Sequence, residues 1–257
     1  MQKRNLIFSS TDTYGVIEVY QDTLLRSLHF GTPARQSAMY PDQPHILPLS
    51  YSRYMLAPLL FIDNPHKILI LGLGAGSLFQ FFRHHMSAII DTVELRQAVV
   101  EVAKKYFQLP EQEPCHNSYV MSAMDFLQNV HEHYDFCLID IYNDQGIDET
   151  LLDEEFYAGL ATHLDANGLC CFNLWSSHPK RYEQICKLIK KQFPYLLVIP
   201  VPRKGNVIIL AAGHNFMLDE SSLRLRAQQL EERFNIEFLT ILEQTLTFNK
   251  DIIPHLL

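Results

Sequence analysis

Polar and apolar residues alternate in the first part of the chain. The alternation covers residues 13–20 and 23–30, which are separated by Gln21-Asp22 and followed by a Gly-Thr-Pro turn. Period-two alternation across a short polar connection is typical of two strands of a β-hairpin. We therefore expect a small antiparallel β unit, and we assign residues 1–50 to an N-terminal domain and residues 51–257 to a second domain.

From Lys67 onward the pattern changes, because apolar runs of strand length alternate with helical patterns. This alternation predicts a parallel sheet with helices on both faces. The last two strands are joined by too few residues for a helical crossover and should pair antiparallel. We thus predict an α/β fold with a mostly parallel, seven-stranded, Rossmann-like sheet of the methyltransferase type. Its expected strands are 68–71, 89–93, 119–121, 136–139, 169–173, 196–199 and 207–211, and the expected helices are 49–61, 75–85, 97–107, 123–131, 152–164, 179–192, 219–234 and 240–247.

Composition narrows the class of ligand. Of the 257 residues, 47% are apolar, which is enough for a sizeable core, and the formal net charge is −8. A negative chain lacks the basic face that nucleic acid requires, so we expect no nucleic-acid partner. The negative charge mildly favours a small cationic substrate. No apolar stretch has the length of a membrane span or of a signal-peptide core, so we expect no membrane association.

Cysteines and histidines give no sign of a disulfide or a metal. There are five cysteines without a C-x-x-C pair, and the adjacent Cys170 and Cys171 should point to opposite faces of one strand. We interpret Cys170 and Cys171 as core residues, and we expect the protein to reside in a reducing cytoplasm. The histidine pairs at 84–85 and 131–133 lack the spacing of a metal site and are interpreted as solvent-facing residues at helix ends.

The strongest local motif is a glycine-rich turn after the first core strand. Gly72, Gly74 and Gly76 form a G-x-G-x-G pattern that leads into a helix. Glycines let the backbone turn tightly and approach a ligand closely. A dinucleotide fingerprint would place a third glycine where Ser77 stands, so the pattern fits a nucleoside or sulfonium ligand better than a pyrophosphate. The alternative is that the glycines serve the turn alone.

Two acids follow neighbouring core strands. Glu94 ends the second of these strands, where an acid can accept hydrogen bonds from both ribose hydroxyls; the alternative is a solvated surface acid. Asp140 follows the strand at 136–139, at the carboxyl edge where open α/β sheets bind ligands; the alternative is a helix-capping or turn residue.

In order and spacing these motifs resemble the spermidine synthase (polyamine aminopropyltransferase) family, in particular its divergent bacterial members. The resemblance covers roughly residues 13 to 213. The matching segments are 14–15, 26–28, 36–39, 64–77, 93–95, 140–142, 155–157 and 164–168.

The resemblance implies a substrate, a reaction and a set of site residues. It implies transfer of an aminopropyl group from decarboxylated S-adenosylmethionine, or binding of S-adenosylmethionine itself, without a metal. It also implies a small amine acceptor and a homodimer. The catalytic candidates are Asp140, Asp144 and Tyr142, although Tyr142 equally fits a packing role. The candidates for binding the nucleoside substrate are Gln36 (otherwise an ordinary turn residue), Tyr51, Gly72, Gly74, Gly76, Glu94, Ser122, Ala123 and Asp140.

The departures from the family pattern concentrate on the amine side. Asn143 stands where the family has a second Asp, with Asp144 one residue beyond. Ser122 replaces the acid that usually contacts the adenine, Arg53 replaces an acid, and Pro202 replaces an aromatic residue. The residues expected to bind the nucleoside therefore match the family pattern more closely than those expected to bind the amine. We expect turnover of putrescine to be weak or absent.

Three functions follow from these residues. In the favoured one, an alkylamine loses a proton and attacks a carbon next to the sulfonium, while Asp140 accepts or relays that proton. The second is an S-adenosylmethionine-dependent methyltransferase, in which Arg53 would pair with the ligand carboxylate. The third is a non-catalytic nucleoside-binding protein that kept the fold.

Overall fold

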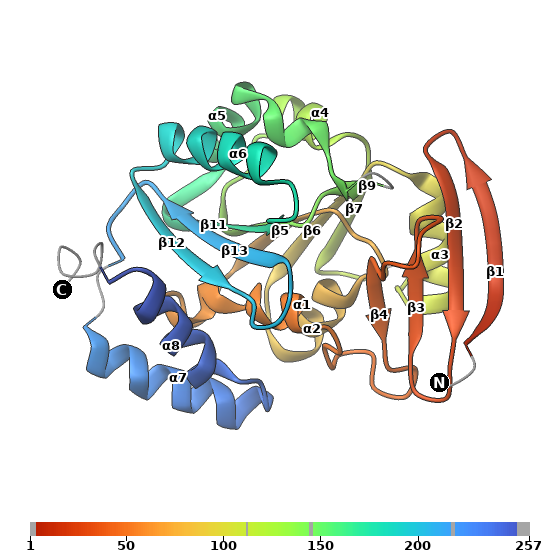
Figure 1. Cartoon of the computed structure of the whole chain (residues 1–257), viewed down its shortest axis with the longest axis horizontal. Helices are drawn as coiled ribbons and strands as arrows, with labels where there is room; N and C mark the ends of the chain where they lie inside the picture. Colours follow the sequence, from red (N-terminus) through yellow and green to blue (C-terminus); the bar gives the residue numbers. More distant parts are fainter. Residues whose placement is uncertain (1–3, 112, 144–145, 217–218, 251–257) are drawn as a thin grey trace.

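The computed structural model describes residues 4–111, 113–143, 146–216 and 219–250. A large sheet with helices on both faces forms the body of the molecule, and a smaller sheet stands beside it (Figure 1). In the part of the chain so described, no helix is long and apolar enough to cross a membrane. Asp144, a predicted catalytic residue, lies outside these ranges.

The N-terminal β unit is a four-stranded antiparallel sheet with strands in chain order. It confirms the predicted hairpin as β2 and β3 and adds β1 and β4, which the sequence pattern did not indicate. The side chains of β1 are mostly exposed, so its sequence carries no apolar alternation. The strands are β1 (Asn5–Asp12), β2 (Gly15–Gln21), β3 (Arg26–His29) and β4 (Ser37–Met39).

The large sheet has seven strands in the order β12-β13-β11-β8-β5-β6-β7. All neighbours pair in parallel except β13, which is antiparallel to both β11 and β12, as predicted. The α/β fold class is therefore confirmed. The strands are β5 (Lys67–Leu71), β6 (Ile89–Glu94), β7 (His116–Val120), β8 (Tyr134–Ile139), β11 (Leu164–Trp175), β12 (Tyr195–Pro200) and β13 (Asn206–Ala212).

Alternate side chains of the strands pack into two separate apolar cores, one on each face of the sheet. Leu69 and Cys170 pack on one face of the large sheet, whereas Ile70 and Cys171 pack on the other. The adjacent cysteines thus point to opposite faces, as predicted. All five cysteines are free.

Helices cover both faces of the large sheet. In Figure 1, α4 (Ala123–Asn129), α5 (Glu154–Thr162) and α6 (Pro179–Gln192) lie above it. The helices below it are α1 (Ser50–Tyr54), α2 (Ser77–His85), α7 (Glu220–Phe234) and α8 (Phe238–Phe248). The remaining elements are α3 (Gln97–Phe107), the 3-10 helices η1 (Ala57–Leu60) and η2 (Glu149–Leu152), and the two-residue strands β9 (Tyr142–Asn143) and β10 (Gly146–Ile147).

Helix α3 connects the two sheets. Its residues Val99, Val102 and Phe107 pack with Ile17 and Val19 of β2 in a third apolar cluster. This packing holds the N-terminal sheet against the edge of the large sheet, next to the carboxyl ends of β5 and β6 (Figure 1).

Several predicted bounds were wrong by two or three residues: the helix predicted at 75–85 begins at Ser77, that at 123–131 ends at Asn129, that at 240–247 begins at Phe238, and the strand predicted at 119–121 begins at His116. For two further helices the structure shows the physical reason. The helix predicted at 49–61 is divided into α1 and η1, because Pro58 has no N–H with which to continue the helical hydrogen-bond ladder. The helix predicted at 152–164 begins at Glu154, because the side chain of Asp153 caps it by accepting from the N–H of Glu155 at 2.9 Å. Leu164 already belongs to β11.

Candidate functional site

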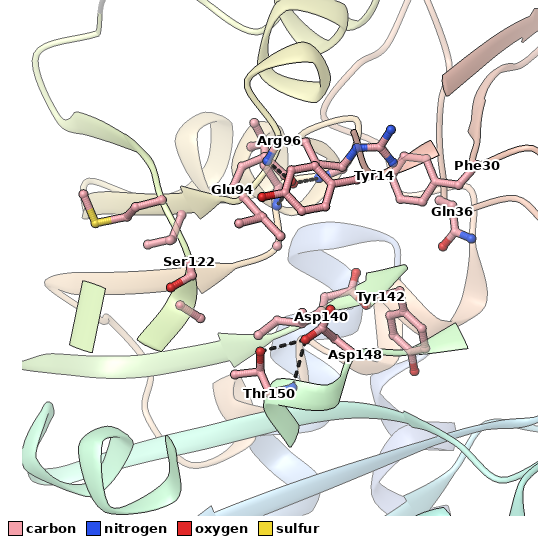
Figure 2. Close-up of a pocket in the computed structure, with 18 of the residues that line it drawn as sticks. Tyr14, Phe30, Gln36, Glu94, Arg96, Ser122, Asp140, Tyr142, Asp148 and Thr150 are labelled. Carbon is pink, nitrogen blue, oxygen red and sulfur yellow. Dashed lines mark hydrogen bonds between the residues drawn. The ribbon is translucent and has the colours of Figure 1, made fainter. Parts of the chain in front are cut away.

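A cavity of about 540 Å³ lies at the carboxyl ends of β5, β6 and β8, beneath the turn between β1 and β2. Figure 2 shows Tyr14, Glu94 and Arg96 on one side of it and Asp140 on the other. The cavity brings together most of the predicted nucleoside-binding residues: Gln36, Gly72, Gly74, Glu94, Ser122, Ala123 and Asp140, with Tyr142 beside them. It also contains residues that were not among the predicted site residues, although Tyr14 and Ser37 lie in segments that resemble the family: Tyr14, Phe30, Ser37, Arg96, Asp148 and Thr150.

The glycine turn exposes main-chain atoms to the cavity, because its glycines have no side chains. Gly72 and Gly74 have φ values of 92° and 53°, which side-chain-bearing residues rarely adopt, and both line the cavity. Gly76, also predicted to bind the ligand, is instead the residue that precedes α2, where a β-carbon would lie 3.3 Å from Leu109. The turn thus gives a ligand close access to the backbone at two of its three glycines.

Glu94 fastens this turn to the end of β6. Its Oε2 accepts from the N–H groups of Leu73 at 3.1 Å and Gly74 at 3.4 Å, and its Oε1 accepts from the N–H of Arg96 at 3.0 Å. Burial raises the pKa of Glu94, against the lowering effect of these N–H groups. A carboxylate offers about four acceptor sites, and the 3.4 Å contact with Gly74 is long, so Glu94 retains capacity for ligand hydroxyls.

Arg96 ties the N-terminal sheet to the site. Its Nη2 and Nε donate to the carboxylate of Asp12 at 2.8 and 3.0 Å, and Nη2 also donates to the carbonyl of Gly15 at 2.9 Å. The guanidinium stacks on Phe30, with 4.7 Å between its central carbon and the ring centroid. Both bonded residues flank the β1–β2 turn, so this clamp positions Tyr14 over the cavity. The sequence shows an arginine two residues after Glu94, but its burial and its pairing with Asp12 arise from tertiary packing.

Ser122 and Ala123 begin α4 at the cavity wall. The hydroxyl of Ser122 accepts from the N–H of Asp125 at 3.0 Å and donates to the Asp125 carboxylate at 2.6 Å. Ser122 is therefore the capping residue of α4, and its hydroxyl proton is already used within the chain.

Asp140 stands at the end of β8 in a chain of polar side chains. Its Oδ1 accepts from the Asn173 amide at 2.8 Å, and the Asn173 oxygen accepts from the Asn206 amide at 2.9 Å. Burial raises the pKa of Asp140 to about 6, while Asn173 and the Tyr51 hydroxyl oppose that rise. A carboxyl that changes its protonation state near neutrality is suited to accepting a proton.

Asp140 also lines a second cavity, of about 560 Å³. Gln36, Asp140 and Tyr142 line both cavities, so the two spaces meet at these residues. Tyr51 lines the second cavity and donates to the Gln36 carbonyl at 2.7 Å, and Tyr142 donates to the Asn173 carbonyl at 2.8 Å. Burial raises the pKa of both phenols well above the ordinary value, so both remain hydrogen-bond donors.

Arg53 is already paired within the chain. Its Nε donates to both carboxylate oxygens of Glu237 at 3.0 and 2.8 Å, and its Nη1 donates to the carbonyls of Leu47 and Pro48 at 3.2 and 3.3 Å. The hypothesis that this guanidinium binds a ligand carboxylate, which supported the methyltransferase alternative, is therefore not favoured. Pro202 is exposed and is absent from the lining of these two cavities.

One histidine interpretation needs correction. His84 is exposed and stacks on His45, with 3.8 Å between the ring centroids. His85 is half-buried rather than solvent-facing: it packs against Phe81 and Phe234, and this burial lowers its pKa to about 4. Within the described ranges, no group of three or more His, Cys, Asp or Glu side chains is arranged to hold a metal ion.

The fold and the resemblance to the spermidine synthases agree with comparisons to known proteins. Residues 50–221 match the family model for the spermine/spermidine synthase domain. A polyamine aminopropyltransferase of Chromobacterium violaceum is 32% identical over 94% of this chain and 93% of its own length. One from Neisseria meningitidis is 27% identical over 86% of each. Two solved structures share the fold, each with a TM-score of 0.73. The spermidine synthase of Thermotoga maritima is 17% identical, and the match covers 99% of this chain and 89% of that chain. A probable spermidine synthase of Corynebacterium glutamicum is 19% identical, and the match covers 91% of this chain and 87% of that chain. The chain therefore belongs to the spermine/spermidine synthase family.

Proposed function

We propose that the protein transfers an aminopropyl group from the sulfonium of decarboxylated S-adenosylmethionine to a small amine. The observation that carries this proposal is the position of Asp140, a half-buried carboxyl that lines both adjoining cavities. A reaction between two substrates requires a site for each and an acid–base group where the sites meet. The family membership and the aminopropyltransferase relatives support the same reaction.

The nucleoside substrate fits the first cavity. Glu94 accepts hydrogen bonds from the ribose hydroxyls, the start of α4 at Ser122 and Ala123 lies against the base, and the backbone at Gly72 and Gly74 allows close approach. Gln36 and Asp140 stand at the junction with the second cavity and therefore border the aminopropyl arm.

The chemistry is a displacement at the carbon next to sulfur. The amine enters from the second cavity as an ammonium with a pKa near that of lysine, about 10.4, and must lose a proton. Asp140 accepts or relays that proton, the nitrogen lone pair forms the new C–N bond, and the C–S bond breaks. The electron pair of that bond stays on sulfur, which becomes the neutral thioether of methylthioadenosine. Tyr142 and Tyr51 bound the reacting centre and donate their protons to backbone carbonyls, so neither is arranged as a base.

The test of this proposal is methylthioadenosine formation. Wild-type protein given decarboxylated S-adenosylmethionine and a panel of amines is expected to release methylthioadenosine in an amine-dependent way. Asp140→Asn should lower kcat by about a hundredfold or more, since general base catalysis is typically worth about 10²–10⁴-fold. Asp165→Asn is the control, because Asp165 is exposed at the start of β11 and lines neither cavity. Release that is independent of amine, or an unaffected Asp140→Asn variant, would refute the role of Asp140.

Asp144 remains a proposed helper in proton removal. Its role can be judged by comparing Asp144→Ala with Asp140→Asn in the same assay. A decrease in kcat in both variants would assign them a joint role, whereas a decrease in Asp140→Asn alone would leave Asp140 as the single base.

We also propose a homodimer in a reducing compartment. Three cysteines are fully buried and free, which suits the cytoplasm, and the dimer follows from the family resemblance. Sedimentation equilibrium at micromolar concentration tests the dimer, and a monomer at all concentrations would contradict it.

A further inference from the structure

Two side-chain amides, those of Asn206 and Asn173, form a hydrogen-bonded chain that ends at Asp140. Nδ2 of Asn206 donates to Oδ1 of Asn173 at 2.9 Å, and Nδ2 of Asn173 donates to Oδ1 of Asp140 at 2.8 Å. The three residues come from neighbouring strands. The parallel strands β8 and β11 end at this edge of the sheet, and the antiparallel strand β13 begins there. Strand pairing therefore holds this amide chain beside the proposed base.

The amide chain has a direction, because both NH2 groups point toward Asp140. An amide donates at its nitrogen and accepts at its oxygen, so the bond from Asn206 requires Asn173 to turn its NH2 group to the other side. Asn173 is 2% exposed, so the partners of its side chain come mainly from the protein. In the reverse orientation, the Asn173 oxygen would face the carboxylate of Asp140, and two acceptors repel each other. Asn206 thus selects the orientation in which Asp140 receives a hydrogen bond as a carboxylate.

We propose that Asn206 is a positioning residue for aminopropyl transfer, which acts through Asn173 to keep Asp140 oriented and ionised as the proton acceptor. Hydrogen bonds in a chain polarise one another, so the bond from Asn206 strengthens the bond from Asn173 to the carboxylate. A hydrogen bond to its charged form lowers the pKa of a carboxyl, and the bond from Asn173 lowers the pKa of Asp140 against the effect of burial. The inference rests on the proposed function, because it takes Asp140 as the base.

Other titratable groups surround Asp140, so the experiment must separate their effects from that of the amide chain. Tyr51, Tyr142 and Cys171 interact electrostatically with Asp140, but burial raises the pKa of each, so all three are neutral at neutral pH. Glu94 lines the nucleoside cavity with Asp140, and burial raises its pKa as well. Asp144 lies outside the described residues. The other charged residues that line the two cavities are Arg35, Arg53, Arg96, Asp148 and Lys204.

The experiment measures kcat against pH for methylthioadenosine release, with decarboxylated S-adenosylmethionine and the amine that the protein uses best. Asn206→Leu should lower kcat about tenfold at neutral pH, the rate equivalent of about one lost hydrogen bond. The loss should shrink as the pH rises, because Asp140 then ionises without the amide chain. Asn206→Asp has the same shape but accepts where Asn206 donates, so it should lose more and shift the acidic limb of the profile further upward. Asn206→Gln keeps an amide and should recover part of the loss.

Three further variants serve as controls. Ser176→Ala removes the 3.0 Å hydrogen bond to the Gly205 carbonyl beside the same strand end, leaves the amide chain intact and should keep the wild-type profile. Asp140→Asn should lose the acidic limb from its residual activity, which assigns that limb to Asp140 rather than to Glu94. The shift caused by Asn206→Leu should persist in an Asp144→Ala background, since the amide chain ends at Asp140.

The outcomes separate this inference from the proposed function. An equal loss of kcat at every pH, a wild-type profile in both Asn206→Leu and Asn206→Asp, or a shift that disappears with Asp144 would overturn the inference and leave aminopropyl transfer standing. If no amine releases methylthioadenosine, the proposed function fails, and NMR titration of the Asp140 carboxyl then decides the inference. A higher midpoint in Asn206→Leu than in wild type supports the role of the amide chain, and equal midpoints refute it.

Discussion

The backbone of Gly72 lies so close to the carbonyl oxygen of Asp140 that a β-carbon on Gly72 would come within 2.2 Å of it. The contact joins the glycine turn after β5 to the end of β8, because Gly72 donates to the Val93 carbonyl and Asp140 donates to the Leu71 carbonyl, both at 2.9 Å. The glycine therefore determines how close the nucleoside cavity lies to the proposed base.

Gly72→Ala should displace Asp140 and weaken the fold. The new β-carbon clashes with backbone, and alanine is strained at a φ of 92°. We expect a loss of about 1–3 kcal/mol in the free energy of unfolding and a strong decrease in kcat. Denaturant unfolding and the methylthioadenosine assay measure both effects. Gly213→Ala is the control, since a β-carbon there would meet nothing within 4 Å. Equal behaviour of the two variants would contradict this view of Gly72.

Glu94→Ala should lose most of its affinity for methylthioadenosine. The variant removes the proposed acceptor of the ribose hydroxyls and also the acceptor for the N–H groups of Leu73 and Gly74. Each hydrogen bond to a charged group is worth about 1.5–3 kcal/mol, so Kd should rise at least about tenfold. Calorimetry measures the change, with Glu101→Ala on the exposed side of α3 as control. Unchanged affinity would show that Glu94 supports the turn without contacting the ribose.

The raised pKa of Asp140 predicts how stability depends on pH. Burial moves the pKa of this carboxyl from 3.8 to about 6, so between those values the native state binds more protons than the unfolded state. The contribution of Asp140 to stability therefore falls as pH rises from about 4 to 6, by about 3 kcal/mol in total. Asp140→Asn should be more stable than wild type above pH 6, with the difference vanishing toward pH 4. Denaturant unfolding at several pH values measures it, and a difference that is constant with pH would show that the pKa is not raised.

The clamp between Arg96 and Asp12 should control binding of the nucleoside substrate. Asp12→Ala removes two hydrogen bonds that hold the β1–β2 turn over the cavity. We expect KM for decarboxylated S-adenosylmethionine to rise about tenfold while kcat at saturation changes little, since Asp140 is untouched. Asp22→Ala, which breaks the neighbouring hairpin turn at the N–H groups of Leu24 and Leu25, is the matched control. A similar rise in KM in both variants would mean that general loosening of the sheet is responsible.

The local pattern of apolar and polar residues predicted the strands of the large sheet well but only two strands of the N-terminal sheet. Strands such as β5 and β8 contain apolar runs of four residues that are buried on both faces, so the sequence marks them clearly. Strand β1 is largely exposed and forms through pairing with β2, which leaves no local signature. The division into domains at residue 50 stays a prediction.

Site residues could be predicted where each stands at the end of a strand that the sequence itself indicates. The glycine turn, Glu94 and Asp140 each follow a recognisable strand, and parallel strands bring their carboxyl ends together. The Arg96–Asp12 clamp joins residues 84 positions apart, and the pairing of Arg53 with Glu237 joins residues 184 positions apart. Contacts at such separation depend on tertiary packing, which no local pattern encodes.

Competition between the two donors distinguishes aminopropyl transfer from methyl transfer by the products formed. Decarboxylated S-adenosylmethionine and S-adenosylmethionine are supplied together in equal amounts with the panel of amines, and the products are identified by mass spectrometry. We expect that an acceptor gains one aminopropyl unit and that an equal amount of methylthioadenosine appears. Methylated acceptor together with S-adenosylhomocysteine, or the absence of any transferred group, would contradict it.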